Sequence, residues 1–594
     1  MINPLKAKIG GAYETWLIVM LIPLLLMNNK VIYHILPINY VLVEIIHGVS
    51  IFIIIFCLID SIWGHEFRQS IVTELRFRSS KIKQQDKLLM RELGIGLGYT
   101  TDNGEYINVP YGVLLKHVLL LGSTGSGKTS FMKLMLWQNV VNGGGGIFID
   151  GKMDYNDFQG FYDLCYAIGR HNDILVVSPG NPEKSNTYNP VINGDTQEIA
   201  SRIISLLPQD ARADFYRNEG FKTLVVLISA MKKLTDVFNM TDLSILMSNE
   251  NAILYLETQL KEKYPNSVET LEFSLYLDGY RENGKLNFAK LKGNISGTAS
   301  KPFTFGLGDM ANICNDYNPE VNLLECIKNN KIVYVMLPTM NKPDASKEFG
   351  KIFLSDFRTV VGWLQQDFTL RPKIPYLVIM DEAGGYANEN WDTLFQQCRS
   401  ANISLIVSAQ SVSNFDDVSN TFFNKIKENT LTSIFMKLQS NESKETVADL
   451  IGQQYKTSLS LNQSRNKSDS GSTQTITSQT RSDGATTSLT QSLKRENIVN
   501  KEELSSIDTG EAIVFYDGRL VFHIKSPFIS SKMHQPFIIH KPIITTKNQG
   551  LHLINQLDKF LKPINESKNN GGTSKGQQIN DDCNTDIMAI SPKF

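Results

Sequence analysis

The sequence lacks paired cysteines, clustered histidines and any large excess of charge. Its six cysteines are scattered along 594 residues without a CxxC pair, which is typical of reduced thiols and argues against a disulfide framework. The nine histidines do not cluster, so a histidine-rich metal site is not indicated. The formal net charge of −1 gives no global attraction to nucleic acid. Any site for a polyanion must therefore be a local patch.

Two long apolar runs open the chain, at residues 11–27 and 38–59. A membrane span needs about 20 mainly apolar residues, so the second run qualifies easily and the first is at the short end. A cleaved signal peptide is the alternative for the first run, but no small-residue cleavage site follows it. Basic residues precede the first run and follow the second, which by the positive-inside rule places both ends in the cytoplasm. We therefore expect a two-helix transmembrane anchor at 1–64 and a juxtamembrane linker at 65–106, in a multi-pass protein with most of its chain cytoplasmic.

From about residue 107 the pattern becomes that of an α/β domain. Short β-rich apolar runs recur, and most are continuous, which suits parallel strands buried on both faces. Predicted helices at 129–141 and 356–366 separate some of these runs, so a doubly wound sheet is expected. The predicted strands are 117–121, 147–150, 174–178, 332–337, 376–380, 404–408 and 433–437.

Three segments depart from this alternation of strands and helices. Residues 195–330 carry apolar residues at helical spacing and predict an all-α domain inserted into the sheet domain. Residues 456–492 are rich in Ser, Thr, Gln and Asn, and they predict a mobile loop. A hairpin around Asp517 and Gly518 is expected to close the sheet. The expected boundaries are 107–194 with 331–545 for the sheet domain, 195–330 for the insertion and 546–594 for a flexible tail.

Residues 122–129 read GSTGSGKT and fit the pattern G-x-x-x-x-G-K-[ST]. A strand precedes the motif and a helix follows it, which is the context that a P-loop requires. Its glycines let backbone N–H groups point at phosphate oxygens, and the helix N-terminus favours the anion. Lys128 would neutralise the β- and γ-phosphates, and the Thr129 hydroxyl would ligate Mg²⁺. With ATP and Mg²⁺ as cofactors, the predicted nucleotide-binding residues are Gly122, Ser123, Thr124, Gly125, Ser126, Gly127, Lys128 and Thr129.

Further candidate residues lie at the ends of two other predicted strands. The apolar run 376–380 leads into Asp381, expected in the Mg²⁺ shell, and Glu382, expected to polarise the attacking water, which suits hydrolysis. Gln410 stands where a third strand should end and could sense the γ-phosphate. Arg399 could act as an arginine finger across a subunit interface, although an ordinary surface arginine is a serious rival.

These motifs resemble those of the type IV secretion coupling proteins, the TraD/TraG-type ATPases of conjugation systems. The resemblance rests on the P-loop, on VIMDEAG at 378–384 and on Arg399 and Gln410 within QQCRSANISLIVSAQS at 396–411. FIDGKMD at 148–154 resembles their Asp-x-Lys element, which matches Lys152 without indicating its role. The resemblance covers roughly residues 11–527 and includes the paired apolar runs and the helical insertion.

The resemblance implies a RecA-like P-loop NTPase domain with an inserted all-α domain and an N-terminal transmembrane anchor. It implies a homo-hexameric ring on the bacterial inner membrane, with a central channel. Such a ring receives single-stranded DNA bound to a relaxase and relaxosome proteins, and in some systems protein effectors with their adaptors. It passes these substrates to the type IV secretion channel at the expense of ATP.

Three alternatives remain open beside this interpretation. An FtsK/HerA-like pump for double-stranded DNA shares the motor, but its membrane-anchored members usually carry more spans and a C-terminal winged helix. An ABC-type transporter ATPase should carry an LSGGQ-like signature before its acidic strand, and the sequence has none. A nonenzymatic substrate receptor with a vestigial nucleotide fold is disfavoured, because Lys128, Thr129, Asp381 and Glu382 are all present.

Overall fold

The structure is a computed structural model of the chain. It describes residues 79–561 apart from 209–213, 388–390, 417, 467–483, 532–533, 543 and 545–547.

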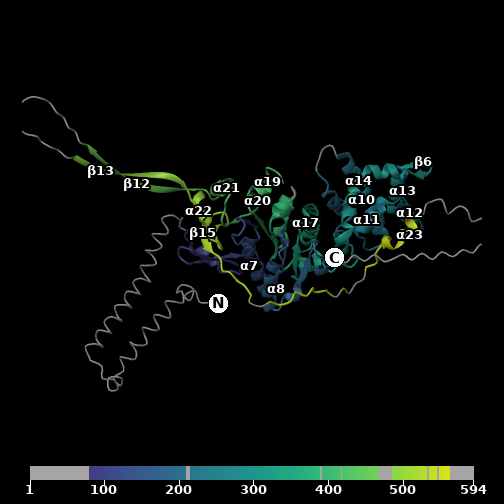
Figure 1. Cartoon of the computed structure of the whole chain (residues 1–594), viewed down its shortest axis with the longest axis horizontal. Helices are drawn as coiled ribbons and strands as arrows, with labels where there is room; N and C mark the ends of the chain where they lie inside the picture. The colour runs from purple at the N-terminus through teal and green to yellow at the C-terminus, as the bar shows by residue number, and fades with distance from the viewer. Residues whose placement is uncertain are drawn as a thin grey trace, which may run out of the picture.

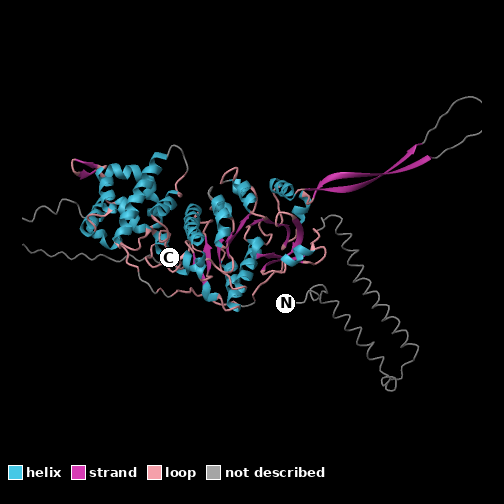
Figure 2. Ribbon diagram, turned by 180° about the vertical axis from the view of Figure 1, so that it is seen from behind, coloured by secondary structure: helices cyan, strands magenta, loops and turns pink. Residues whose placement is uncertain are grey.

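A mixed sheet of eleven strands forms the centre of the described chain (Figure 2). In sheet order the strands are β2 (Tyr106–Pro110), β1 (Gly94–Thr100), β15 (Leu520–Lys525), β14 (Glu511–Tyr516), β11 (Thr432–Phe435), β3 (Val118–Leu121), β10 (Ile403–Ala409), β9 (Tyr376–Met380), β4 (Gly146–Asp150), β8 (Ile332–Met336) and β5 (Ile174–Val177). From β11 to β5 neighbouring strands are parallel, and β14, β15, β1 and β2 extend the sheet in antiparallel fashion.

Helices cover both faces of the parallel part of the sheet, as the continuous apolar strands predict. Every residue of β3, β4, β8, β9 and β10 is buried, because each strand packs against a layer on either side. One face contacts α7 (Lys128–Val141) and α8 (Tyr155–Ala167). The other face contacts α17 (Pro343–Gln366) and α18 (Trp391–Cys398). The parallel part of the sheet is therefore doubly wound, as predicted. The four antiparallel strands make the sheet as a whole mixed.

A helical insertion separates β5 from β8 and forms a bundle at one end of the molecule, beside α17 (Figure 1). Its core continues into the core on the α17 face of the sheet. The insertion also contains a two-stranded hairpin of β6 (Arg281–Glu282) and β7 (Lys285–Leu286), so it is mainly helical and not all-α as predicted. Its helices are α9 (Thr196–Ile204), α10 (Asp214–Leu234), α11 (Met240–Ser248), α12 (Glu250–Lys263), α13 (Val268–Asp278), α14 (Phe288–Phe305), α15 (Gly308–Cys314) and α16 (Leu323–Lys328).

Two segments expected to be irregular belong to sheets. Strand β1 falls within the predicted linker 65–106. Its alternating glycines conceal the strand pattern in the sequence, yet they pair with β2, and Tyr99 and Thr100 pair with β15. The described parts of the polar tract 456–492 lie in β12 (Gln453–Asn466) and β13 (Gly484–Asn497), which pair as a long hairpin that projects from the body (Figure 1). A low apolar content predicts a loop, but strand pairing here depends on backbone hydrogen bonds within the ribbon.

The chain after β15 packs on the rest of the molecule, and this includes the described part of the predicted tail. Phe537 packs its ring edge-on against Phe158 and Tyr162 of α8, and the His540 carbonyl accepts a hydrogen bond from the Asn186 side chain. Beyond residue 547 the chain reaches the helical insertion, where its buried apolar side chains join the core. Residues 548–561 are therefore an ordered part of the fold, because the side chains of Leu553 and Phe560 are buried. The polar composition around these two residues hides them in the sequence.

The predicted multi-pass location in the inner membrane is overturned for the part of the chain that the structure describes. None of the helices described between residues 79 and 561 is long and apolar enough to cross a membrane. The 24-residue helix α17 has the length, but it is amphipathic and carries charged residues along its exposed face. The predicted anchor, residues 1–64 with both spans, lies outside the described residues.

Candidate active site

The P-loop joins the end of β3 to the start of α7, as its sequence predicts. Gly125 and Gly127 have φ angles of 78° and 100°, which residues with a side chain rarely adopt. The Ser126 hydroxyl donates to the Ser123 carbonyl oxygen at 2.8 Å and fixes the turn. The loop therefore delivers Lys128 at the first position of α7, where the helix N-terminus attracts anions.

Lys128 is buried, and its ammonium donates to the carbonyl oxygen of Gly122 in its own loop. Burial lowers the pKa of this ammonium, and the nearby carboxylates of Glu382 and Asp381 partly oppose that effect. A buried cation whose partner is a neutral carbonyl gains from an arriving anion. The arrangement therefore suits a group that neutralises phosphate.

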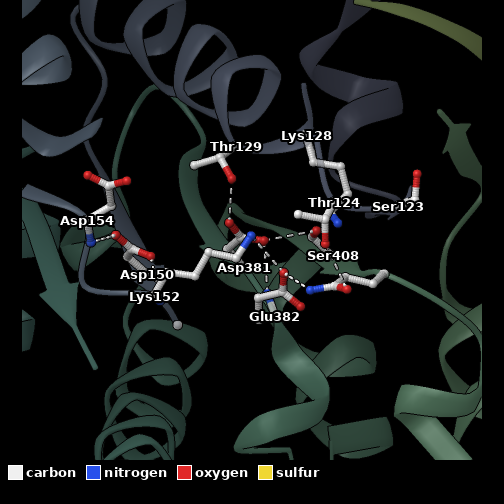
Figure 3. Close-up of polar contacts among 12 residues, drawn as sticks. Ser123, Thr124, Lys128, Thr129, Asp150, Lys152, Asp154, Asp381, Glu382 and Ser408 are labelled. Carbon is white, nitrogen blue, oxygen red and sulfur yellow. Dashed lines mark hydrogen bonds and ion pairs between the residues drawn. The ribbon is translucent and has the colours of Figure 1, made fainter. Parts of the chain in front are cut away.

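Asp381 directly follows β9 and lies across from Thr129 (Figure 3). The Thr129 hydroxyl donates to Asp381 Oδ2 at 2.9 Å, and the Ser408 hydroxyl donates to Asp381 Oδ1 at 3.2 Å. Burial raises the pKa of the Asp381 carboxyl, and the neighbouring Glu382 adds to the rise. A hydroxyl and a buried carboxylate form the hard oxygen set that Mg²⁺ prefers, so Thr129 and Asp381 fit the predicted metal role.

Glu382 lies at the centre of a hydrogen-bonded chain that begins in the P-loop (Figure 3). The Thr124 hydroxyl donates to Gln410 Oε1 at 3.1 Å, and Gln410 Nε2 donates to Glu382 Oε1 at 2.8 Å. The ammonium of Lys152 forms an ion pair with the same oxygen of Glu382 at 3.0 Å. Thr124 and Gln410 therefore connect the phosphate loop to the predicted water-polarising carboxylate, and Lys152 pairs with that carboxylate from another strand end.

Asp150, at the end of β4, is a site residue that the sequence did not single out. It accepts backbone N–H bonds from Lys152 at 2.8 Å and from Asp154 at 3.3 Å, which shapes the turn carrying Lys152. Burial raises the pKa of its carboxyl to about 6, and Asp381 contributes to the shift. The Asp-x-Lys element at 150–152 was the sequence signal that could have identified Asp150, because Asp150 supports the turn that carries Lys152.

Arg399 does not join this group within its own chain. It is exposed and lies before the amino end of β10, whereas Ala409, at the other end of that strand, pairs with Leu121 beside the P-loop. Seven strand residues, about 20 Å at the usual rise, separate the two ends. Gln410 is thus brought to the site, and Arg399 is not.

A cavity of about 680 Å³ adjoins the P-loop on the side of the antiparallel strands. Gly127 and Phe131 form one wall, and the chain leaving β15 supplies Pro527, Phe528 and Ile529. Its largely apolar lining suits the base and ribose of a nucleotide. Sequence reasoning missed Pro527, Phe528 and Ile529, because they lie some 400 positions after the P-loop and carry no motif.

Comparison with known proteins finds similarity to coupling proteins and to related helicases. The family described as the TraM recognition site of TraD and TraG matches residues 375–509, and the central domain of the helicase HerA matches residues 95–293. The type 4 coupling protein DotL of Legionella pneumophila is 24% identical over 457 residues, covering 68% of this chain and 56% of DotL. The chain thus spans about half the length of this curated relative.

Solved structures show the same fold. The bacterial conjugative coupling protein TrwB matches with a TM-score of 0.52 and 14% identity, over 78% of this chain and 96% of that one. A structure of TrwB in complex with ADP and Mg²⁺ matches with a TM-score of 0.50 and 14% identity, over the same shares.

The mixed sheet, the P-loop and the acidic strand end define the class of P-loop domains that resemble the central domain of HerA. Within that class the chain is a relative of the type IV coupling proteins, as its motifs predict.

Proposed function

We propose that this chain is an ATP-hydrolysing coupling protein that delivers substrate to a type IV secretion or conjugation channel. The observation that carries the proposal is the connection from Thr124 through Gln410 to Glu382, beside the Thr129–Asp381 pair. A nucleotide-binding receptor without turnover would have no need to couple its phosphate loop to a water-polarising carboxylate.

The residues divide the work of hydrolysis by position. Thr129 and Asp381 would hold Mg²⁺, which when bound neutralises phosphate charge. Lys128 leaves the Gly122 carbonyl for the phosphates, and Glu382 orients and polarises water. Gln410 touches both the P-loop and Glu382, so it can relay loss of the γ-phosphate to β10.

The proposed substrate is single-stranded DNA with its relaxase and relaxosome proteins, and protein effectors with adaptors are the second class. The proposed assembly is a homo-hexamer, in which Arg399 would reach the nucleotide of a neighbouring subunit. The match to the HerA central domain favours one other candidate, a pump for double-stranded DNA.

Two substitutions test the chemistry. Lys128→Ala should abolish ATP binding and turnover, whereas Glu382→Gln should bind ATP normally and hydrolyse it at least about 100-fold more slowly. ATP turnover measured with and without single- and double-stranded DNA separates the two motor candidates. Normal turnover in the Glu382→Gln protein would refute the assignment of the carboxylate, and absence of turnover in the wild type would favour the receptor.

A further inference from the structure

A second cavity, of about 210 Å³, lies where the helical insertion meets the nucleotide-binding domain. Helices α9 and α10 of the insertion form one side, and α17 and α18 of the sheet domain form the other. The polar part of its lining consists of arginine guanidinium groups and serine hydroxyl groups. The nucleotide site makes no use of it.

Two guanidinium groups, Arg217 from α10 and Arg358 from α17, line this cavity. Neither is paired with a carboxylate among the residues that the structure describes, and Arg217 Nε is buried without a hydrogen-bond partner there. Ser201 and Ser355 add hydroxyl groups from the two sides. A sheltered guanidinium without a partner is costly, so convergent unpaired donors indicate that an anion belongs between them.

The walls of the cavity are held rigidly from behind. Arg202, which follows Ser201, forms an ion pair at 3.0 Å with Asp356, which follows Ser355, and both side chains are completely buried. Arg202 also donates to Thr359 at 2.9 Å, and Tyr188 donates to Asp356 at 2.9 Å. This bonding braces α9 against α17, so Ser201, Ser355 and Arg358 stay in place with no ligand bound, as a preorganised site requires.

The rest of the lining is aromatic and aliphatic. Phe221 and Trp391 contribute rings, and Trp391 is 3% exposed. Guanidinium groups beside aromatic rings are the combination that binds single-stranded nucleic acid, because arginine pairs with phosphate and a ring stacks on a base. A carboxylate from an acidic protein segment would use the arginines but would leave the rings without a role.

We propose that this cavity binds one nucleotide unit of single-stranded nucleic acid, with its phosphate between Arg217 and Arg358 and its base against Phe221 and Trp391. The proposal rests on the proposed function and deepens it, because it gives the nucleic-acid substrate a contact at the junction of the two domains. A strand held there touches both α10 and α17. Movement between the domains would therefore move the strand.

The test is binding of a fluorescent oligothymidylate to the full chain over a range of salt concentrations. Arg217→Gln with Arg358→Gln should weaken binding at least about tenfold and reduce the log–log salt slope by about 0.7, the value for the one phosphate contact that the two arginines share on a single strand. Arg358→Lys should keep the slope and lose only part of the affinity. Lys328→Gln, which removes a surface charge paired with Glu325 on the insertion, is the matched control and should change neither.

Each outcome decides the proposal. Unchanged affinity and slope in the double variant would overturn it, provided that the variant melts as the wild type does. If the double variant misfolds, Arg358→Lys and Phe221→Leu carry the test, and full wild-type binding by both would overturn it. Poly-glutamate binding that depends on the arginines, without oligothymidylate binding, would replace the nucleotide with an acidic protein segment. Loss of oligothymidylate binding with ATP turnover intact would leave the ATPase assignment standing.

Discussion

Glu382 accepts two donors in the nucleotide site, Gln410 Nε2 at 2.8 Å and Lys152 Nζ at 3.0 Å. Its backbone also has a left-handed φ of 52°, an uncommon conformation for a side chain of this size. Burial lowers the pKa of the Lys152 ammonium, but the hydrogen bond to Glu382 and the charges of the nearby carboxylates together outweigh burial and raise this pKa overall. Lys152 therefore stays charged and competes with water for the carboxylate.

This competition predicts that Lys152 distinguishes triphosphate from diphosphate. An arriving γ-phosphate can take the Lys152 ammonium and free Glu382, whereas ADP lacks that group. Lys152→Met should weaken binding of a non-hydrolysable ATP analogue about tenfold, because a charge-assisted contact is lost, and should leave ADP affinity nearly unchanged. Calorimetric titration of both nucleotides checks this, with Lys342→Met, a surface pair to Asp309, as control. Equal losses for the two nucleotides would contradict the prediction.

A second prediction concerns His117, whose neutral ring joins two elements. Its Nε2 donates to the Phe395 carbonyl at 2.7 Å, and its Nδ1 accepts from the Leu405 backbone N–H at 3.0 Å. Burial lowers its pKa to about 4 from an ordinary 6.5. Between pH 6.5 and 4, the ring therefore binds a proton in the unfolded chain but stays neutral in the folded chain. The folded state is consequently destabilised as the pH falls from 6.5 towards 4.

The loss should reach about 3 kcal/mol of unfolding free energy, at about 1.4 kcal/mol for each pKa unit. Urea denaturation at pH 7, 5.5 and 4.5 should show a shallower pH dependence in His117→Gln than in the wild type. Identical pH dependences would mean that folding does not lower the pKa of this ring.

Site residues are predictable from sequence to the extent that they lie inside one local pattern. The P-loop and the Asp381–Glu382 pair follow a strand directly, so strand, turn and chemistry coincide within a few positions. Gln410 was placed correctly because parallel strands end at one edge of the sheet. Phe528 and Asp150 were missed, the first because only the three-dimensional fold brings it to the P-loop and the second because its role is to support a neighbour.

At the scale of elements, the junction of α9 and α17 depends on the buried ion pair of Arg202 and Asp356. Burial raises the pKa of Asp356, and the positive charge of Arg202 counters that effect. Arg202→Met would leave a buried carboxylate without its cation and should cost about 3–5 kcal/mol of unfolding free energy. Adding Asp356→Leu should recover most of this loss, because the uncompensated charge is then removed. Thermal melts of the two variants check the prediction, and equal destabilisation by both would contradict it.

Elements were predicted well where apolar residues mark them. The strands β3, β4, β9 and β10 lie where continuous apolar runs stand. The hairpin β12–β13 was missed because a two-stranded ribbon can form through backbone pairing over 14 residue pairs, whatever its composition. Hydrophobic patterning detects burial, and this ribbon projects from the body of the protein (Figure 2).

At the scale of the whole molecule, the separation of Arg399 from its own P-loop has an assembly consequence. If Arg399 completes a neighbour's site in a ring, neither Arg399→Ala nor Lys128→Ala subunits should turn over ATP alone. Mixtures should recover activity at interfaces that pair an intact P-loop with an intact arginine, because such a finger is worth about 10³–10⁵ in rate. Steady-state ATPase measurements on mixtures check this. No recovery in mixed assemblies verified by crosslinking would count against a finger at Arg399.

The path of the chain after β15 has a mechanical consequence. The ordered segments of this path lie against α8 at Phe537 and next to β5 at His540, and then end on the insertion at Leu553 and Phe560 (Figure 1). A load applied at the C-terminus would therefore enter through the helical bundle and reach the sheet only after these contacts part in turn. The segment lies as a strap across the domain junction, so a pull on it would strain the junction before the nucleotide site.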